Sequence, residues 1–233
     1  MQKKLLILMI GLSILIFCNQ NRKEKSNKKE IVISQGIDSD FKTFDIDFGF
    51  KVTIGKEEDF ETFKTYTYFE LKRNNNIIYV DRSLIDYEFG NALFPIAIQT
   101  GDNSFELLFE INNRPSKNYL NRFIIRDDKL IEQDNLPVFE AESKDINNDG
   151  IKEYSGIWHY SQIWGENNNI TAYSPILYYS VTETGLQLDS TLTRERNELI
   201  YGQFYGFLFS EKYEQPISII DKFEQELNRI RSK

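Results

Sequence analysis

One stretch of strict alternation between apolar and polar residues, and a second with the same apolar spacing, restrict this chain to folds built on β-sheets. In Phe44–Ile54, apolar side chains occupy every even position, while the odd positions carry Asp, Gly, Lys or Thr. The same spacing recurs in Phe105, Leu107, Phe109 and Ile111. A period of two places the apolar side chains on one face of a strand, so both stretches predict half-buried strands.

Other short segments with strand character are separated by turn clusters. They are Thr65–Leu71, Ile77–Val80, Arg122–Arg126, Val138–Ser143, Tyr154–Tyr160, Pro175–Thr182 and Leu199–Phe209. The asparagines of Arg73–Asn76 tolerate positive φ, so we expect a hairpin between the first two segments. Many short strands at this spacing predict a mainly β fold, as an antiparallel sheet, a sandwich or a partial-propeller-like domain.

Only the C-terminus shows a helical period. Pro216 suits a first helical turn, and apolar residues then recur at steps of three and four, namely Ile217, Ile220, Phe223, Leu227 and Ile230. The spacing predicts one amphipathic helix over residues 216–231. Packing of its apolar face on the sheet is the simpler interpretation, and binding of a partner is the alternative.

The first thirty residues have the composition of an export signal and a linker. Lys3 and Lys4 precede the apolar run Leu5–Phe17, which is shorter than the roughly 20 residues of a membrane-spanning helix. Cys18, the only cysteine, ends this run, and residues 18–30 are polar and charged, as is typical of a flexible tether. We therefore expect a signal peptide over residues 1–17 and a β-rich domain over residues 31–233.

This arrangement resembles the signal of bacterial lipoproteins, with Leu15-Ile16-Phe17-Cys18 in the place of the lipobox. In that family the cysteine becomes the first residue of the mature protein and carries the lipid on its sulfur. The resemblance implies that Cys18 anchors the protein to a membrane of the bacterial cell envelope, at the outer membrane or its periplasmic face. An uncleaved short anchor, or an ordinary signal with an incidental cysteine, is the alternative.

Cysteine usage and charge exclude several classes of function. With Cys18 lipidated, the mature domain has no thiol for disulfides, thiolate catalysis or Cys-ligated zinc. The chain carries 28 Lys and Arg against 36 Asp and Glu, a formal net charge of -8. An acidic body repels nucleic-acid phosphates, so we expect no nucleic-acid partner.

The segment Asp145–Glu153 has the ligand spacing of a calcium loop. Calcium binds six to eight hard oxygens, and alternate side chains of one loop can converge on the ion. Gly150 permits the sharp turn that such a loop needs, whereas Gly156 stands where an EF-hand requires Glu. We therefore expect a structural calcium ion held by Asp145, Asn147, Asp149, the Ile151 carbonyl and Glu153.

The loop resembles the calcium loop of FG-GAP and VCBS repeats, the integrin-like β-propeller modules, in which Asp-x-Asx-x-Asp-Gly-x-x-Asp/Glu joins two strands. The resemblance covers about Pro137–Tyr160, and the chain carries no second copy. Solitary loops of this kind occur in secreted bacterial β proteins, including periplasmic inhibitor and immunity proteins of lysozyme-like enzymes. A metal-free hairpin turn at Asn148-Asp149-Gly150 is the alternative.

No catalytic constellation can be named from the sequence. His159 is the only histidine, and no Gly-x-Ser-x-Gly nucleophile accompanies it, so a half-buried strand position is expected for it. Trp158, Tyr160, Trp164 and the stretch Tyr173–Tyr179 could stack on a sugar or a partner. A β-core with exposed tyrosine edges is the simpler interpretation of these aromatic residues.

Together these features predict a lipid-anchored, calcium-binding, non-enzymatic module that binds a protein or glycan partner in the cell envelope. One alternative is a periplasmic inhibitor or immunity-type protein against a cell-wall hydrolase, as the single-loop resemblance implies. Another is a carboxylate-dependent hydrolase of envelope glycans, which would use a pair of acidic residues. An acidic pair in a deep cleft would favour the enzyme, and an exposed aromatic or loop protrusion would favour the binding protein.

Overall fold

The computed structural model of the protein describes residues 34–35, 40–60, 63–83, 86–89, 93–164, 170–208 and 216–218. Contacts divide the chain between Glu30 and Ile31, and every described residue belongs to the second unit. The predicted signal peptide, Cys18 and the tether therefore lie outside the described residues. Within those residues no helix has the length and apolar character needed to cross a membrane. The described fold is mainly β, as predicted.

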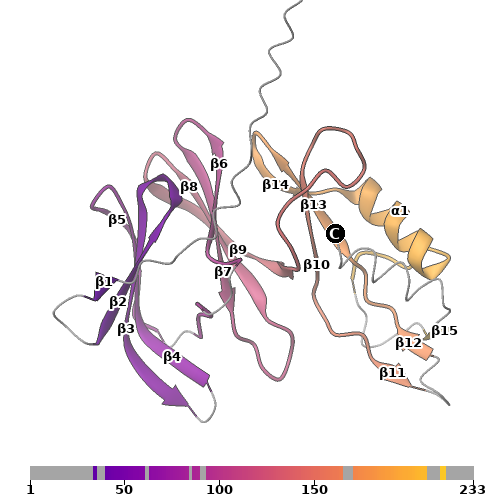
Figure 1. Ribbon diagram of the computed structural model, residues 1–233, viewed down its shortest axis with the longest axis horizontal. Coiled ribbons are helices and arrows are strands. Elements are labelled where there is room, and N and C mark those ends of the chain that lie inside the picture. Colours follow the sequence, from indigo (N-terminus) through magenta and orange to yellow (C-terminus); the bar gives the residue numbers. More distant parts are fainter. Residues whose placement is uncertain are drawn as a thin grey trace, which may run out of the picture. The chain divides into compact units, whose positions relative to one another are not determined.

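The N-terminal part of this unit is an antiparallel sheet with its strands in chain order (Figure 1). Its strands are β1 (Ser34–Gln35), β2 (Phe41–Ile46), β3 (Phe50–Phe60), β4 (Phe63–Arg73) and β5 (Asn76–Asp81). The predicted hairpin between β4 and β5 is confirmed. Asn74 and Asn75 form its turn with φ values of 49° and 70°, the left-handed region that asparagine tolerates.

The segment Phe44–Ile54 forms two strands, so the prediction of a single strand is wrong. The short 3-10 turn η1 (Asp47–Gly49) reverses the chain between β2 and β3. Phe48 and Gly49 make this reversal possible with φ values of 61° and 77°. Phe48 is 44% exposed at the tip of the turn.

The buried positions keep their alternation through this turn, which explains the error. Ile46 pairs with Phe50, and Phe44 pairs with Val52 on the opposite strand. Directly paired residues of an antiparallel sheet lie on the same face. All four side chains are therefore buried on one face, and a hairpin has the same apolar pattern as one long strand.

The second sheet has seven antiparallel strands in the order β14-β13-β10-β9-β8-β7-β6. Its strands are β6 (Ile96–Gly101), β7 (Ser104–Ile111), β8 (Tyr119–Arg126), β9 (Lys129–Phe139), β10 (Glu153–Ile157), β13 (Leu177–Thr182) and β14 (Gly185–Leu188). Most of the predicted strands overlap these. The predicted strand Val138–Ser143 is wrong beyond Phe139, where β9 ends.

Strand β7 is buried on both faces, although its alternation predicts burial on one face only. Phe105, Leu107 and Phe109 join a core with residues of β2, β3 and β4 from the first sheet. Leu108 lies in a second core with residues of β8, β9, β10, β13 and β14. The second face of β7 is covered because the seven-stranded sheet coils. Strand β14, at one edge of the sheet, thereby contacts β6 and β7 near the opposite edge.

The C-terminal region contains a small third sheet, with strands β11 (Ile163–Trp164), β12 (Ile170–Ala172) and β15 (Pro216–Ser218). The predicted helix over residues 216–231 is wrong at its start, because Pro216–Ser218 pairs with β12. Pro216 is tolerated there since β15 is an edge strand, where a missing N–H costs little. Residues 219–231 lie outside the described residues.

The one α-helix of the described residues is α1 (Ser190–Tyr201), which corrects the prediction of a strand over Leu199–Phe209. Asp189 caps its first turn by accepting a hydrogen bond from the Leu192 N–H at 2.8 Å. Gly202 ends the helix with a φ of 81°, a common C-terminal cap.

Asn197 docks α1 onto the chain before β13. Its side chain is fully buried, donates to the Ile176 carbonyl at 2.8 Å and accepts from the Ile176 N–H at 3.0 Å. The Thr193 hydroxyl accepts from the Tyr178 N–H at 3.0 Å. Polar side chains of the helix thus satisfy buried backbone groups, which apolar packing could not do.

Candidate calcium-binding loop

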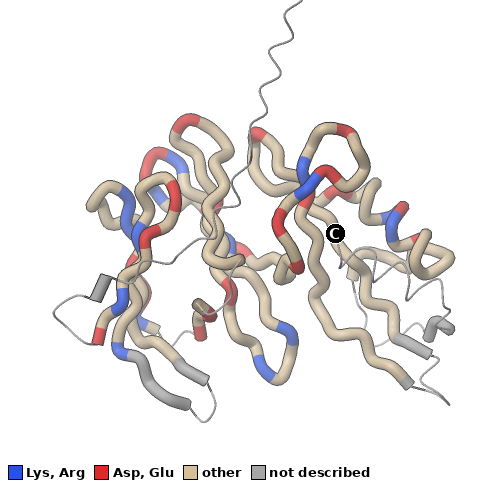
Figure 2. Tube along the Cα trace, in the orientation of Figure 1, with Lys and Arg blue, Asp and Glu red and all other residues tan. Residues whose placement is uncertain are grey.

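The loop Asp145–Glu153 leads from β9 into β10, and Figure 2 shows acidic residues along it. Two backbone hydrogen bonds between Lys144 and Glu153, of 3.1 and 2.8 Å, close its base. Asn148 and Gly150 adopt left-handed conformations, with φ values of 64° and 90°. The sequence Asn-Asp-Gly therefore forms a tight turn, which both the calcium prediction and the metal-free alternative require.

Three side chains fold inward and accept hydrogen bonds from the backbone of the loop. Asp145 accepts from the N–H groups of Asp149 and Gly150 at 3.1 and 3.0 Å. Asn147 accepts from the Asp149 N–H at 3.1 Å, and its amide donates to the Asp149 carboxylate at 2.8 Å. Asp149 in turn accepts from the Ile151 N–H at 2.8 Å. These contacts bring Asp145, Asn147 and Asp149 together in one small turn.

Glu153 differs from these residues because its side chain is buried. It is 1% exposed, and one carboxylate oxygen, Oε2, accepts from the Ile146 N–H at 2.9 Å. The other oxygen, Oε1, is buried with no hydrogen-bond partner. Burial raises the pKa of this carboxyl, and the nearby charges of Asp149, Asp145 and Asp189 raise it further. The hydrogen bond from the Ile146 N–H lowers the pKa, but by less than burial raises it.

The structure gathers only part of the predicted ligand set. Among the residues that it describes, no three His, Cys, Asp or Glu side chains lie close enough together to hold a metal ion. Ile151 is exposed. The donor set nevertheless fits calcium chemically, since it consists of hard oxygens and includes a buried carboxylate oxygen that lacks a partner.

Helix α1 and strand β13 fix the loop from outside. The Arg196 guanidinium donates to the Ile146 carbonyl at 2.9 Å, and Ile146 packs against the core cluster under α1. The Val181 N–H donates to the Lys152 carbonyl at 2.8 Å. The loop is therefore connected to two elements that follow it in the sequence, and its conformation can affect both.

His159 and the aromatic candidates do not form a site with this loop. His159 is exposed and follows the end of β10, so the prediction of a half-buried strand histidine is wrong. Tyr173, Tyr178 and Tyr179 are buried in the core, as the simpler interpretation predicts. Tyr160 is 63% exposed, and the side chain of Trp164 lies outside the described part.

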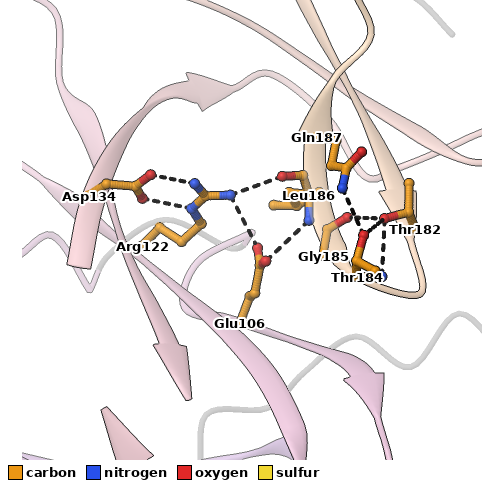
Figure 3. Close-up of polar contacts among 8 residues, drawn as sticks. All are labelled: Glu106, Arg122, Asp134, Thr182, Thr184, Gly185, Leu186 and Gln187. Atoms are coloured by element: carbon orange, nitrogen blue, oxygen red, sulfur yellow. Dashed lines mark hydrogen bonds and ion pairs between the residues drawn. The ribbon is translucent and has the colours of Figure 1, made fainter. Parts of the chain in front are cut away.

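A buried ion network is the main polar feature that sequence reasoning missed (Figure 3). Arg122 on β8 donates through two nitrogens to the carboxylate of Asp134 on β9 and through Nη1 to the Leu186 carbonyl at 3.0 Å. Glu106 on β7 is 2% exposed and accepts from the Leu186 N–H at 3.2 Å. The network therefore ties edge strand β14 to β7 and β8, the strands against which the sheet coils.

Gly185 is required where this network meets β14. Its φ is +118°, and a Cβ there would lie 1.9 Å from the Glu106 carboxylate. Any side chain at this position would displace Glu106, so the glycine permits the close approach.

In comparisons with known proteins, no family model, no curated protein and no solved structure matches the chain significantly.

Proposed function

We propose that this protein is a lipid-anchored, calcium-binding module of the bacterial cell envelope that acts by binding rather than by catalysis. The observation that carries the calcium assignment is the partnerless Oε1 of Glu153. A buried carboxylate oxygen without a donor costs free energy that a nearby cation would recover. A calcium ion supplies that positive charge.

The hydrogen bonds inside the loop are compatible with this ion. Each carboxylate oxygen has more than one lone pair, so Asp145 and Asp149 can accept from backbone N–H groups and still bind calcium. Asp145, Asn147, Asp149 and Glu153 would hold the ion together with the Ile151 carbonyl. Calcium suits such a loop because it accepts irregular geometry, whereas magnesium requires a small octahedron.

The ion's role would be structural. The loop is bonded to Arg196 of α1 and to Val181 of β13, so calcium would stabilise the packing of these elements as well as the turn. Anchoring is supported by the sequence around Cys18, with its basic start, apolar run and polar tether. The binding role is supported by the sequence, in which no recognisable nucleophile motif accompanies His159.

A thermal melt of the full-length protein in detergent tests the calcium assignment. Calcium at ten times its dissociation constant stabilises a single-site protein by about 1.4 kcal/mol, which for this length raises Tm by about 3–6 °C. Magnesium should raise Tm less than calcium. Equal melts in calcium and in chelator would show that the loop is a metal-free turn.

Two loop variants and one control locate the ion. Glu153→Gln and Asp149→Ala should each remove most of the calcium-dependent rise in Tm. Asp102→Asn changes an exposed carboxylate in the turn between β6 and β7, and it should keep the full rise. A rise that survives both loop variants would place the ion elsewhere.

A further inference from the structure

A polar pocket of about 300 Å³ lies at the ends of β5, β7 and β8, and its lining includes none of the residues of the calcium loop. The polar and aromatic residues that line it are Asp81, Asp86, Tyr87, Asn112, Tyr119 and Asn121. A water molecule occupies about 30 Å³ of liquid, so one bridging water cannot fill this volume. The pocket is of the size at which small-molecule sites begin, about 300 Å³.

Two lining side chains each have a buried polar atom that makes no hydrogen bond. They are Oδ1 of Asp86, an acceptor, and Nδ2 of Asn112, a donor. The side chain of Asn112 belongs to a residue that is only 7% exposed. A buried donor and a buried acceptor without partners are costly, so a pocket bordered by both favours a ligand that can bind both.

The two residues are neighbours across a pair of antiparallel segments. The Asn112 N–H donates to the Asp86 carbonyl at 2.7 Å, next to the bridge between Tyr87 and Ile111. Directly paired residues place their side chains on the same face. The side chains of Asp86 and Asn112 therefore lie on the same face, at the pocket that both residues line.

Other polar atoms of the lining already have partners within the protein. Asp81 accepts from the Ser83 N–H and hydroxyl at 2.8 and 2.7 Å and from the Tyr79 hydroxyl at 3.2 Å. Oδ1 of Asn112 accepts from the Arg114 N–H at 3.1 Å. Burial raises the pKa of Asp86. Asp86 and Asn112 therefore each offer a ligand one atom that makes no hydrogen bond within the protein.

The chemistry of the lining selects the class of ligand. An anion is disfavoured because Asp81 and Asp86 line the pocket, and the lining residues that the structure describes include no Lys, Arg or His. A cation or an ammonium group would satisfy Asp86 but would place a positive charge against the donor of Asn112. A neutral ligand with several hydroxyls satisfies both, because each hydroxyl donates and accepts.

We infer that this pocket binds a neutral saccharide unit, with one hydroxyl donating to Asp86 and an adjacent hydroxyl accepting from Asn112. Further hydroxyls of the same ring would meet Tyr119 and Asn121, which a small amide has too few polar atoms to do. The inference goes beyond the calcium-binding module, since it names a glycan as the partner chemistry and does not depend on calcium.

Saturation-transfer difference NMR on the full-length protein tests this inference. The protein is held in lauryldimethylamine oxide, since detergents with sugar head groups would compete for the pocket. The probes are D-glucose, D-galactose, D-mannose and N-acetyl-D-glucosamine, with acetamide and ethylamine as the amide and ammonium alternatives. We expect transfer to at least one sugar, both in calcium and in chelator, so that this result is independent of the calcium proposal.

Variants of the two available groups show whether the sugar occupies this pocket. Asp86→Ala and Asn112→Leu should each weaken binding about tenfold or more, because each removes a buried hydrogen bond to the ligand. Asp102→Asn, in an exposed turn, should bind as the wild type does, and melting curves confirm that each variant is folded. The inference is wrong if no sugar shows transfer, if only acetamide or ethylamine does, or if both pocket variants bind the sugar normally.

Discussion

The guanidinium of Arg122 lies 3.6 Å from the carboxylate of Glu106, a residue that is 2% exposed. At this distance the contact is an ion pair, and Oε2 of Glu106 has no hydrogen bond. Burial raises the pKa of Glu106, while the charge of Arg122 and the Leu186 N–H lower it. Arg122 therefore makes a buried negative charge tolerable at the point where β14 meets β7.

Replacement of Arg122 should reveal how far the coiled sheet depends on this charge. Arg122→Met keeps much of the side-chain volume but leaves Glu106 buried with only the Leu186 N–H. We expect a loss of about 3 kcal/mol in the free energy of unfolding, as is typical when one partner of a buried pair is removed. Urea denaturation measures this loss, and a value within the error of the wild type would contradict the role given to Arg122.

A double variant separates loss of packing from loss of charge compensation. Glu106→Gln in the Arg122→Met background removes the uncompensated charge and keeps a side chain that can accept from Leu186. We expect it to recover a large part of the lost stability, which a double-mutant cycle quantifies. If the two substitutions are additive, Glu106 and Arg122 are energetically independent.

The strands of this fold could be predicted because the alternation of apolar and polar residues does not depend on how the strands are connected. The pattern in Phe44–Ile54 locates the buried side chains of both strands, but it wrongly places Phe48, where the chain reverses, on the buried face. The sequence could not predict the covered second face of β7, because that depends on the coiling of a seven-stranded sheet. Contacts between β14 and β7 join positions about eighty residues apart, and no local pattern encodes them.

Helix α1 was missed for a physical reason. Its buried face contains Thr193 and Asn197 beside Leu192 and Ile200, so an apolar period is weak. The caps were readable, since Asp189 and Gly202 stand at the two ends of the helix. Capping residues identify this helix better than hydrophobicity because polar side chains dock it.

Asn197 should therefore be among the most sensitive positions of α1. Asn197→Leu preserves the volume but leaves the N–H and carbonyl groups of Ile176 without partners. Each orphaned buried group costs about 1–3 kcal/mol, so we expect a loss of about 2 kcal/mol or more in urea denaturation. Glu195→Leu is the matched control, since Glu195 is exposed on the same helix. Equal effects of the two substitutions would show that the buried amide is not important.

The candidate calcium loop was readable because its ligands lie within nine consecutive residues. Which of these ligands are buried could not be predicted from the sequence. Asp145 and Asp149 are exposed, whereas Glu153 is buried as the first residue of β10. Likewise, Asp86 and Asn112 are 26 positions apart in the sequence, so their pairing across two segments requires the fold.

The lipid anchor predicts a simple change in fractionation. Wild-type protein made in a bacterial host should enter the detergent phase and incorporate labelled fatty acid. Cys18→Ala should abolish the labelling, because the chain has no other thiol to carry the lipid. More than one acyl chain is needed for stable attachment, so a mass spectrum of the N-terminal peptide should show several. Absence of label in the wild type would contradict the anchor.

The pH dependence of stability should identify Glu153 as the group that links calcium to folding. Its pKa is raised in the folded state above the ordinary 4.5, first by burial and then by the charges of Asp149, Asp145 and Asp189. Between 4.5 and the raised value, the folded protein binds more protons than the unfolded protein. The free energy of unfolding contributed by this group therefore falls as the pH rises through that interval.

Comparison with Glu153→Gln isolates this contribution from those of the other carboxylates. In calcium-free buffer, the wild type should lose stability relative to the variant as the pH rises from 4.5 through the raised pKa of Glu153. At the upper end of this pH interval the carboxylate is charged, so calcium should restore the stability of the wild type. At the lower end the carboxylate is protonated, so calcium should have little effect on stability. Urea denaturation at each pH measures the difference between the two proteins. A difference that is constant across this range, with and without calcium, would mean that Glu153 neither takes up a proton on folding nor binds the ion.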